Sequence, residues 1–215
     1  MINILKLKEN IVYKNFLLRL LSSFIFVTIY LFVSYIDFNL VFYLIVFIYL
    51  GVFIEIFLNF KRYKIIPLLY IFLSFIFFIL INFNNLTFLN FNLFIFTVIS
   101  FDIFSYIFGK SFGNTKLIKI SPNKTIEGLL GGIFITLALS ISLAYFNNII
   151  INIQFVCLIV FIIFFAFIGD IIESYFERKN NLKNSSELIP GHGGIFDRFD
   201  SFLFSIILYS VFLNF

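Results

Sequence analysis

The amino-acid sequence predicts an all-α protein, a polytopic bundle of about seven transmembrane helices. Of its 215 residues, 62% are hydrophobic and only 12% are charged, whereas about 25% of the residues of ordinary soluble domains are charged. Apolar runs recur at about the 20-residue length that a helix needs to cross the hydrocarbon core of a bilayer. The lysines and arginines fall into a few short segments between these runs, as in membrane proteins with a fixed orientation.

The apolar runs define the expected helices in chain order. They predict helices near residues 17–35, 38–59, 64–82, 91–109, 126–146, 152–175 and 200–214. The last run is short for a span, so we expect that helix to lie at an angle or to end in the far headgroup region. Residues 1–90 would then form a helical scaffold, and residues 91–215 a functional region with two long polar loops, 110–125 and 176–199.

Positive charge predicts the orientation of the bundle. All fifteen Lys and Arg residues lie in or close to segments 1–16, 60–64, 110–125 and 176–199, and the loops on the opposite side contain none. Because basic loops remain in the cytoplasm, we expect an integral protein of the cytoplasmic membrane with its N-terminus inside, its C-terminus outside and both polar loops facing the cytoplasm. This topology explains the net charge of +4. The basic face would also attract anionic membrane lipids or nucleotides, and no nucleic-acid partner is needed to account for it.

Two further features of the sequence concern processing and redox chemistry. The N-terminal segment lacks a short apolar core followed by a small-residue cleavage site, so we expect no removed signal peptide. The single cysteine, Cys157, lies in an apolar run. It is therefore expected to be a small buried core residue and not part of a disulfide or a metal site.

Four carboxylates form two pairs with the same spacing. Asp170 and Glu173 are three residues apart, so they share one face of a helix, and Asp197 and Asp200 repeat this spacing before the final run. Asp102 lies inside the fourth run, where a charge normally faces a polar cavity or a partner. Acidic pairs that meet would repel one another unless a cation neutralised them, and oxygen ligands suit Mg²⁺.

The alternative is that these carboxylates form interfacial salt bridges with Arg178, Arg198 and nearby lysines. We adopt that interpretation for three other acidic residues, Glu9, Asp37 and Glu187. For the two pairs we favour a metal site.

A glycine-rich turn directly precedes the second acidic pair. Its glycines allow backbone conformations with positive φ and exposed amides, an arrangement that can cradle phosphate oxygens. His192, between two of the glycines, has little to pack against and could donate a hydrogen bond to a phosphate. A simple turn is the alternative. The Asp-Arg-x-Asp sequence that follows at a membrane boundary favours the phosphate site. The turn comprises Pro190, Gly191, His192, Gly193 and Gly194.

The other polar loop carries a second set of candidates. Asp102, Ser105, Tyr106 and Gly109 fall at helical spacing on one face, with Lys110 and Gly113 just beyond. A predicted helix start, whose free amides favour an anion, is surrounded by four polar residues, Ser121, Lys124, Thr125 and Glu127. The alternative for these four is a helix cap with topology-setting lysines. A P-loop ending at Lys110 is rejected, because no parallel-sheet pattern accompanies it.

Together these motifs resemble the signature of the phosphatidate cytidylyltransferase (CDP-diacylglycerol synthase) family, over roughly residues 100–201. That signature reads Ser-x-x-Lys-Arg, four residues, Lys-Asp, a short spacer and Pro-Gly-His-Gly-Gly-x-x-Asp-Arg-x-Asp-Ser. The residues that match it in register are Ser174, Arg178, Lys183, Pro190, Gly191, His192, Gly193, Gly194, Asp197, Arg198, Asp200 and Ser201. The preceding Gly169-Asp170-x-x-Glu173 and the segment from Asp102 to Gly128 resemble the family as well.

Two positions depart from the family signature. Glu177 stands where the family has lysine, which inverts a charge beside the expected phosphate site, and Asn184 stands where the family has aspartate. Lys179 is a neighbouring candidate to replace the missing lysine. A metal-ligand role at position 184 is not expected.

The resemblance implies an enzyme of phospholipid biosynthesis that converts CTP and phosphatidic acid into CDP-diacylglycerol and pyrophosphate. It implies that an oxygen of the lipid phosphate attacks the α-phosphorus of CTP in line, with Mg²⁺, and a second cation such as K⁺ as a further candidate. The implied metal ligands are Asp170, Glu173, Asp197 and Asp200, and the implied phosphate contacts are Lys124, Lys183, His192 and Arg198. Further nucleotide-binding residues would be Lys110, Ser121, Thr125, Arg178, Gly191, Gly193 and Gly194. The cavity or the lipid headgroup site would be lined by Asp102, Tyr106 and Lys110.

Other functions fit part of the pattern. A related CTP-dependent membrane enzyme, such as a polyprenol kinase or a CDP-archaeol-type synthase, would use the same kind of site with another acceptor. A small transporter or scaffold would fit the hydropathy equally well, but it would not need two polar loops with matched acidic pairs on one side. The sequence leaves open whether the protein forms a homodimer.

Overall fold

The computed structural model describes residues 21–22, 24–83, 86–118, 120–121, 124–189 and 193–214. Over these residues the protein is all-α, as predicted, with only two isolated β-bridges between loop residues. A helical segment, Phe24–Ile36, precedes the main helices. These are α2 (Leu40–Asn59), α3 (Ile65–Ile79), α4 (Phe88–Phe112), α5 (Ile126–Phe146), α6 (Ile153–Lys179) and α7 (Phe196–Asn214).

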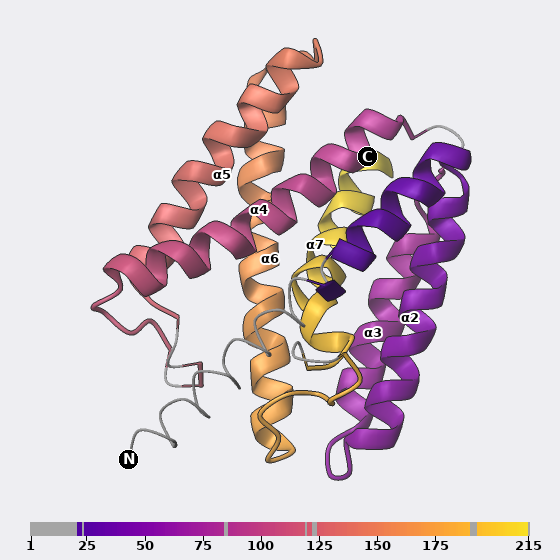
Figure 1. Ribbon diagram of the computed structural model, residues 1–215, viewed down its shortest axis with the longest axis vertical. Helices are drawn as coiled ribbons and strands as arrows, with labels where there is room; N and C mark the ends of the chain where they lie inside the picture. Colours follow the sequence, from indigo (N-terminus) through magenta and orange to yellow (C-terminus); the bar gives the residue numbers. More distant parts are fainter. Residues whose placement is uncertain are drawn as a thin grey trace.

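Helices α4 and α7 each pack against several of the other helices. Helices α6 and α7 run side by side, and α3 packs on the other side of α7 with α2 beside it (Figure 1). The long helix α4 crosses this group obliquely and packs along α5, which leans away from the rest of the bundle (Figure 1). The start of α5 lies against the last turns of α4, and the start of α7 lies against the later half of α6 (Figure 1).

Polar side chains fix where three helices begin. The hydroxyl of Thr87 accepts a hydrogen bond from the amide of Asn90 at the start of α4, and Asn152 caps α6 by accepting from the amide of Phe155 at 2.8 Å. Thr125 caps α5 in the same way, through the amide of Gly128 at 3.1 Å. Each bond satisfies an amide that has no partner within its own helix.

Four helices, α2, α4, α5 and α6, are long and apolar enough to cross a membrane. Segment Phe24–Ile36 and α3 are apolar but shorter. The seven spans and the orientation therefore remain predictions. Three helices extend beyond the predicted spans on the side of the polar loops: α4 continues to Phe112, α6 continues to Lys179, and α7 begins at Phe196.

Aromatic rings fill much of the core. Phe94 and Tyr209 stack with their ring centroids 4.4 Å apart, and Phe42 stacks on Phe78 at 5.2 Å. The expectation that Cys157 is buried was wrong, because it is exposed on α6. An apolar residue on the outer face of a spanning helix can be exposed because lipid covers that face, so an apolar run does not distinguish core from lipid contact.

Small residues let α4 and α5 cross closely. A Cβ atom added at Gly128 would lie 2.7 Å from the carbonyl oxygen of Ser105 and 2.9 Å from the Cα of Gly109. Because both contacts are with backbone, a side chain there would have to separate the helices.

We therefore expect leucine at Gly128 to destabilise the protein by about 1–3 kcal/mol, the usual cost of overpacking a core. For a chain of this size, each kcal/mol lowers the unfolding midpoint by about 2–4 °C. Thermal unfolding in detergent measures the change, with Leu130→Ala, an exposed position on the same helix, as the control. A Gly128→Leu midpoint equal to that of the wild type would contradict the tight crossing.

Candidate active site

An open cavity of about 440 Å³ lies where α4, α5, α6 and α7 meet. Its volume is within the range of small-molecule sites. The polar residues that line it come from all four helices and from both polar loops: Asp102, Ser105, Tyr106, Ser121, Lys124, Thr125, Asp170, Glu173, Glu177, Lys183, Asn184, Asp197, Arg198, Asp200 and Ser201.

Three of the predicted metal ligands come together in this cavity. Each of Asp170, Glu173 and Asp200 offers a carboxylate oxygen, and these oxygens all lie within 4.8 Å of one another. Glu173 and Asp200 are buried. The meeting depends on Gly169, because a Cβ atom there would lie 2.5 Å from the carbonyl oxygen of Asp200. A larger residue at position 169 would push α7 away from α6 and separate the carboxylates.

A second carboxylate group overlaps the first. Oxygens of Glu173, Glu177 and Asp197 also lie within 4.8 Å of one another. Glu177 is 3% exposed, and its Oε1 is buried without a hydrogen-bond partner. Its Oε2 accepts a hydrogen bond from Arg178 at 3.4 Å. The position where the family has lysine therefore places a buried carboxyl group inside the cavity.

Lys179 does not line the cavity. Its Nζ lies 5.5 Å from the centroid of the Tyr175 ring, so in this structure it does not take the place of the missing lysine.

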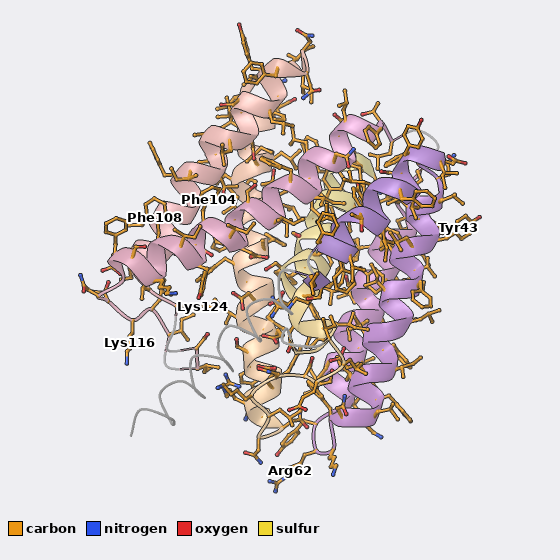
Figure 2. All side chains as sticks on the ribbon, viewed as in Figure 1. Tyr43, Arg62, Phe104, Phe108, Lys116 and Lys124 are labelled. Carbon is orange, nitrogen blue, oxygen red and sulfur yellow. The ribbon has the colours of Figure 1, made fainter. Side chains whose placement is uncertain are left out.

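Three positively charged side chains that were predicted to contact phosphate line the cavity beside the carboxylates. Lys124, which Figure 2 labels, forms an ion pair of 2.8 Å with Asp170 and lies over the ring of Phe167. This ion pair is the kind of contact that the salt-bridge alternative anticipates, but it neutralises only one carboxylate of the group. Lys183 and Arg198 line the same cavity.

Helix α4 supplies one wall of the cavity. Asp102 accepts a hydrogen bond from the hydroxyl of Ser201 at 2.9 Å, which joins α4 to α7. Ser105 and Tyr106 also line the wall, as their spacing predicts. Lys110 is not part of the lining, and its ammonium group lies 5.9 Å from the centroid of the Tyr106 ring.

The residues before α5 have two roles. Ser121 and Thr125 line the cavity, while the Thr125 hydroxyl caps the helix, which agrees with the capping alternative. Glu127 points back to the preceding loop, where its carboxylate accepts hydrogen bonds from the hydroxyl and the amide of Thr115 at 2.7 and 3.2 Å.

The described part of the glycine turn uses its amides internally. Gly193 has a φ of +92°, and its amide donates to the carbonyl of Ile189 at 3.2 Å. The amide of Gly194 donates to Asp197 at 3.0 Å. Neither amide therefore points freely into the cavity, and contacts of these two glycines with a nucleotide remain a prediction. Pro190, Gly191 and His192 lie outside the described residues.

Arg178 braces the loop after α6. Its guanidinium donates to the carbonyl oxygens of Leu182 and Lys183 at 2.8 and 3.3 Å, and it does not line the cavity. A nucleotide contact by Arg178 remains a prediction.

The sequence analysis missed Glu55 and Ser185. Glu55 is 1% exposed on α2 and accepts hydrogen bonds from the Ser185 hydroxyl and from backbone amides at the start of α7. An acidic residue inside an apolar run is itself a signal of a polar partner, and Glu55 carried that signal.

The donor set fits a hard divalent cation. All candidate ligands are carboxylate oxygens, the donors that Mg²⁺ prefers. Two of the three residues in the first group are buried, where unneutralised negative charges are costly.

Replacing Glu177 with glutamine removes a carboxylate from the second, overlapping group at nearly constant size. We expect the variant to unfold at a higher temperature than the wild type in EDTA, by about 2–4 °C for each kcal/mol of repulsion that is relieved. The difference should shrink when Mg²⁺ is added, since a cation relieves the same repulsion. Thermal unfolding in detergent tests this, with Glu187→Gln, on the exposed loop surface, as the control. An unchanged or lower midpoint in EDTA would contradict the expected repulsion.

Comparison with known proteins agrees with the geometry. Three relatives, each matched over 114 residues that cover 52% of this chain and 44% of the relative, are named phosphatidate cytidylyltransferase: 43% identical in Staphylococcus aureus (strain COL), 44% in Staphylococcus haemolyticus (strain JCSC1435) and 42% in Staphylococcus epidermidis (strain ATCC 12228 / FDA PCI 1200). The matched region thus spans less than half the length of these relatives. Residues 2–215 match the model of the cytidylyltransferase family, and the chain belongs to that family.

Proposed function

We propose that this protein is an integral membrane phosphatidate cytidylyltransferase, which transfers CMP from CTP to phosphatidic acid to form CDP-diacylglycerol and pyrophosphate. The observation that carries the proposal is the cavity in which Asp170, Glu173 and Asp200 meet beside Lys124, Lys183 and Arg198. A site that joins two phosphate compounds needs both a cation-binding group and positively charged side chains. The names of the matched relatives support the same reaction.

The proposed chemistry needs positioning more than proton transfer. A phosphate monoester is already ionised near neutral pH, so an oxygen of phosphatidic acid attacks the α-phosphorus of CTP without a strong general base. The bond from the α-phosphorus to the bridging oxygen breaks, and pyrophosphate leaves with its electron pair. The protein has to hold the two phosphates in line and offset their negative charges.

The cavity residues divide this task by charge. Asp170, Glu173 and Asp200, with Asp197 at the edge of the group, would hold Mg²⁺, which when bound offsets charge on the triphosphate. Lys183 and Arg198 would contact phosphate oxygens directly, and Lys124 would do so while remaining near Asp170.

The proposed membrane arrangement brings the lipid to this cavity. Four helices can span the bilayer, and the cavity lies at the end of the bundle that carries the two basic polar loops. The distribution of Lys and Arg favours the cytoplasmic side of the cytoplasmic membrane for this end, where CTP is available. Tyr106 is 66% exposed at the cavity wall, and it is a candidate contact for the lipid headgroup.

Labelled CTP tests the reaction directly. Purified protein with phosphatidic acid and Mg²⁺ should move label from the α-phosphate of CTP into lipid, whereas γ-label in the lipid would indicate a kinase. Replacing Asp200 with asparagine should lower kcat by at least about 100-fold, the upper end of the losses seen for residues that support metal ligands. Glu187→Gln is the matched control. Near-normal turnover by Asp200→Asn would contradict the assigned role.

Single cysteines test the proposed orientation. In a Cys157→Ser background, Glu187→Cys should react with a membrane-impermeant maleimide only after cells are permeabilised, because basic loops remain in the cytoplasm. Asn147→Cys, in the loop between α5 and α6, should react in intact cells. The reverse pattern would place the cavity on the outer side.

A further inference from the structure

A buried carboxylate in the N-terminal half of the chain reaches the loop that leads into α7. Glu55 is 1% exposed on α2, far from the polar loops in sequence. Its Oε2 accepts hydrogen bonds from the amides of Ile195 and Phe196, at 2.8 and 3.0 Å. Its Oε1 accepts a hydrogen bond from the hydroxyl of Ser185. One side chain thus joins both ends of the loop segment 185–196 to α2.

The position of Gly194 agrees with this interaction. A Cβ atom added there would lie 1.7 Å from Oε1 of Glu55 and 2.0 Å from the Ser185 hydroxyl. Any other residue would displace the carboxylate or the loop. The requirement for glycine at position 194 therefore reflects the close approach of Glu55 in this structure.

The same loop orients Asp197. The two carboxylate oxygens of Asp197 accept hydrogen bonds from the amides of Ser185 and Gly194, at 2.9 and 3.0 Å. Ser185 is therefore held by Glu55 through its hydroxyl and by Asp197 through its amide. A shift of the loop would move Asp197 and the first turn of α7, which carries Asp200.

We propose that Glu55 is a positioning residue of the active site: it anchors Ser185, Ile195 and Phe196 and so fixes Asp197 and Asp200 in the cavity. A buried carboxylate is stable only where hydrogen bonds or charges compensate its lost hydration, and these three donors provide that compensation. The amides that Glu55 occupies belong to the start of α7, where unpaired amides favour a negatively charged partner. This inference rests on the proposed function for its catalytic readout only.

The consequence concerns how phosphates are bound. Because Glu55 and Asp197 occupy the amides of Gly194, Ile195 and Phe196, these groups do not cradle a phosphate. At this end of the loop, phosphate recognition then falls to side chains, and the candidates on the same loop and helix are Lys183 and Arg198.

Variants of Glu55 in the full-length protein separate geometry from charge. Glutamine keeps an acceptor oxygen for the two amides, and its NH₂ group can donate to the Ser185 hydroxyl, so Glu55→Gln should retain the anchor. Aspartate keeps the charge but is one methylene shorter, so Glu55→Asp should lose part of it. Alanine should lose it entirely. Glu187→Ala, on the exposed surface of the same loop, is the matched control.

Two measurements test whether Glu55 holds the start of α7 in place. Hydrogen–deuterium exchange in detergent, without substrate, should be faster over residues 193–200 in Glu55→Ala and in Glu55→Asp, and close to the wild type in Glu55→Gln. In the cytidylyl-transfer assay, kcat of Glu55→Ala should fall by roughly 100-fold, the loss that a misplacement of about 1 Å can cause. The Mg²⁺ concentration for half-maximal activity should rise, while exchange over α5 remains unchanged.

The outcomes distinguish this inference from the proposed function. If the wild type transfers no cytidylyl group, the proposed function fails, and the exchange data still test the anchor. If exchange over 193–200 is the same in all variants, or if Glu55→Asp retains more protection than Glu55→Gln, the inference is overturned. If Glu55→Ala does not fold, the comparison of glutamine with aspartate decides. A further outcome would also contradict a positioning role. In it, Glu55→Gln keeps the slow exchange of residues 193–200, but Glu55→Asp needs the same Mg²⁺ concentration for half-maximal activity as the wild type.

Discussion

The candidate site depends on the close approach of α6 and α7, because this approach brings negative charges from two helices into one small volume. Gly169 makes the approach possible, since a Cβ atom there would meet the carbonyl oxygen of Asp200 at 2.5 Å. Carboxylates confined in this way repel one another unless positive charge is present. Lys124 supplies part of that charge through its ion pair with Asp170. The packing of two helices therefore creates the demand for a cation, and in the proposed reaction the same cation would also offset negative charge on the nucleotide triphosphate.

The glycine turn has a different role in the structure from the one that its sequence suggests. Runs of glycine before a helix often present free amides to phosphate. Here the amides of Gly193 and Gly194 bind the carbonyl of Ile189 and the carboxylate of Asp197. The glycines give the loop the space to approach other parts of the protein closely. Acceptors within the protein occupy these amides, so Gly193 and Gly194 do not offer free amides to a ligand.

The N-terminal helices contribute more than a hydrophobic support. The hydroxyls of Tyr49 and Ser74 lie 2.7 Å apart, and Ser74 donates to the carbonyl of Leu203, so α2, α3 and α7 share a buried polar connection. Glu55 adds a second connection, at the start of α7. Both connections hold α7 from the side opposite α6. Helices α2 and α3 are therefore joined to α7 by specific hydrogen bonds as well as by apolar packing.

The sequence by itself determined the helical class, the approximate positions of the helices and most residues of the cavity. Apolar runs can only be satisfied by buried or lipid-facing helices, and carboxylates three residues apart must share a helix face. The sequence did not determine which face of each run meets lipid, and Cys157 was misjudged for that reason. Only the tertiary structure decided that Glu55 reaches a loop more than a hundred residues away, that Lys179 lies beside Tyr175 and that the amides of Gly193 and Gly194 are already paired. These contacts depend on the relative placement of helices, and helical periodicity fixes the direction of a side chain only within its own helix.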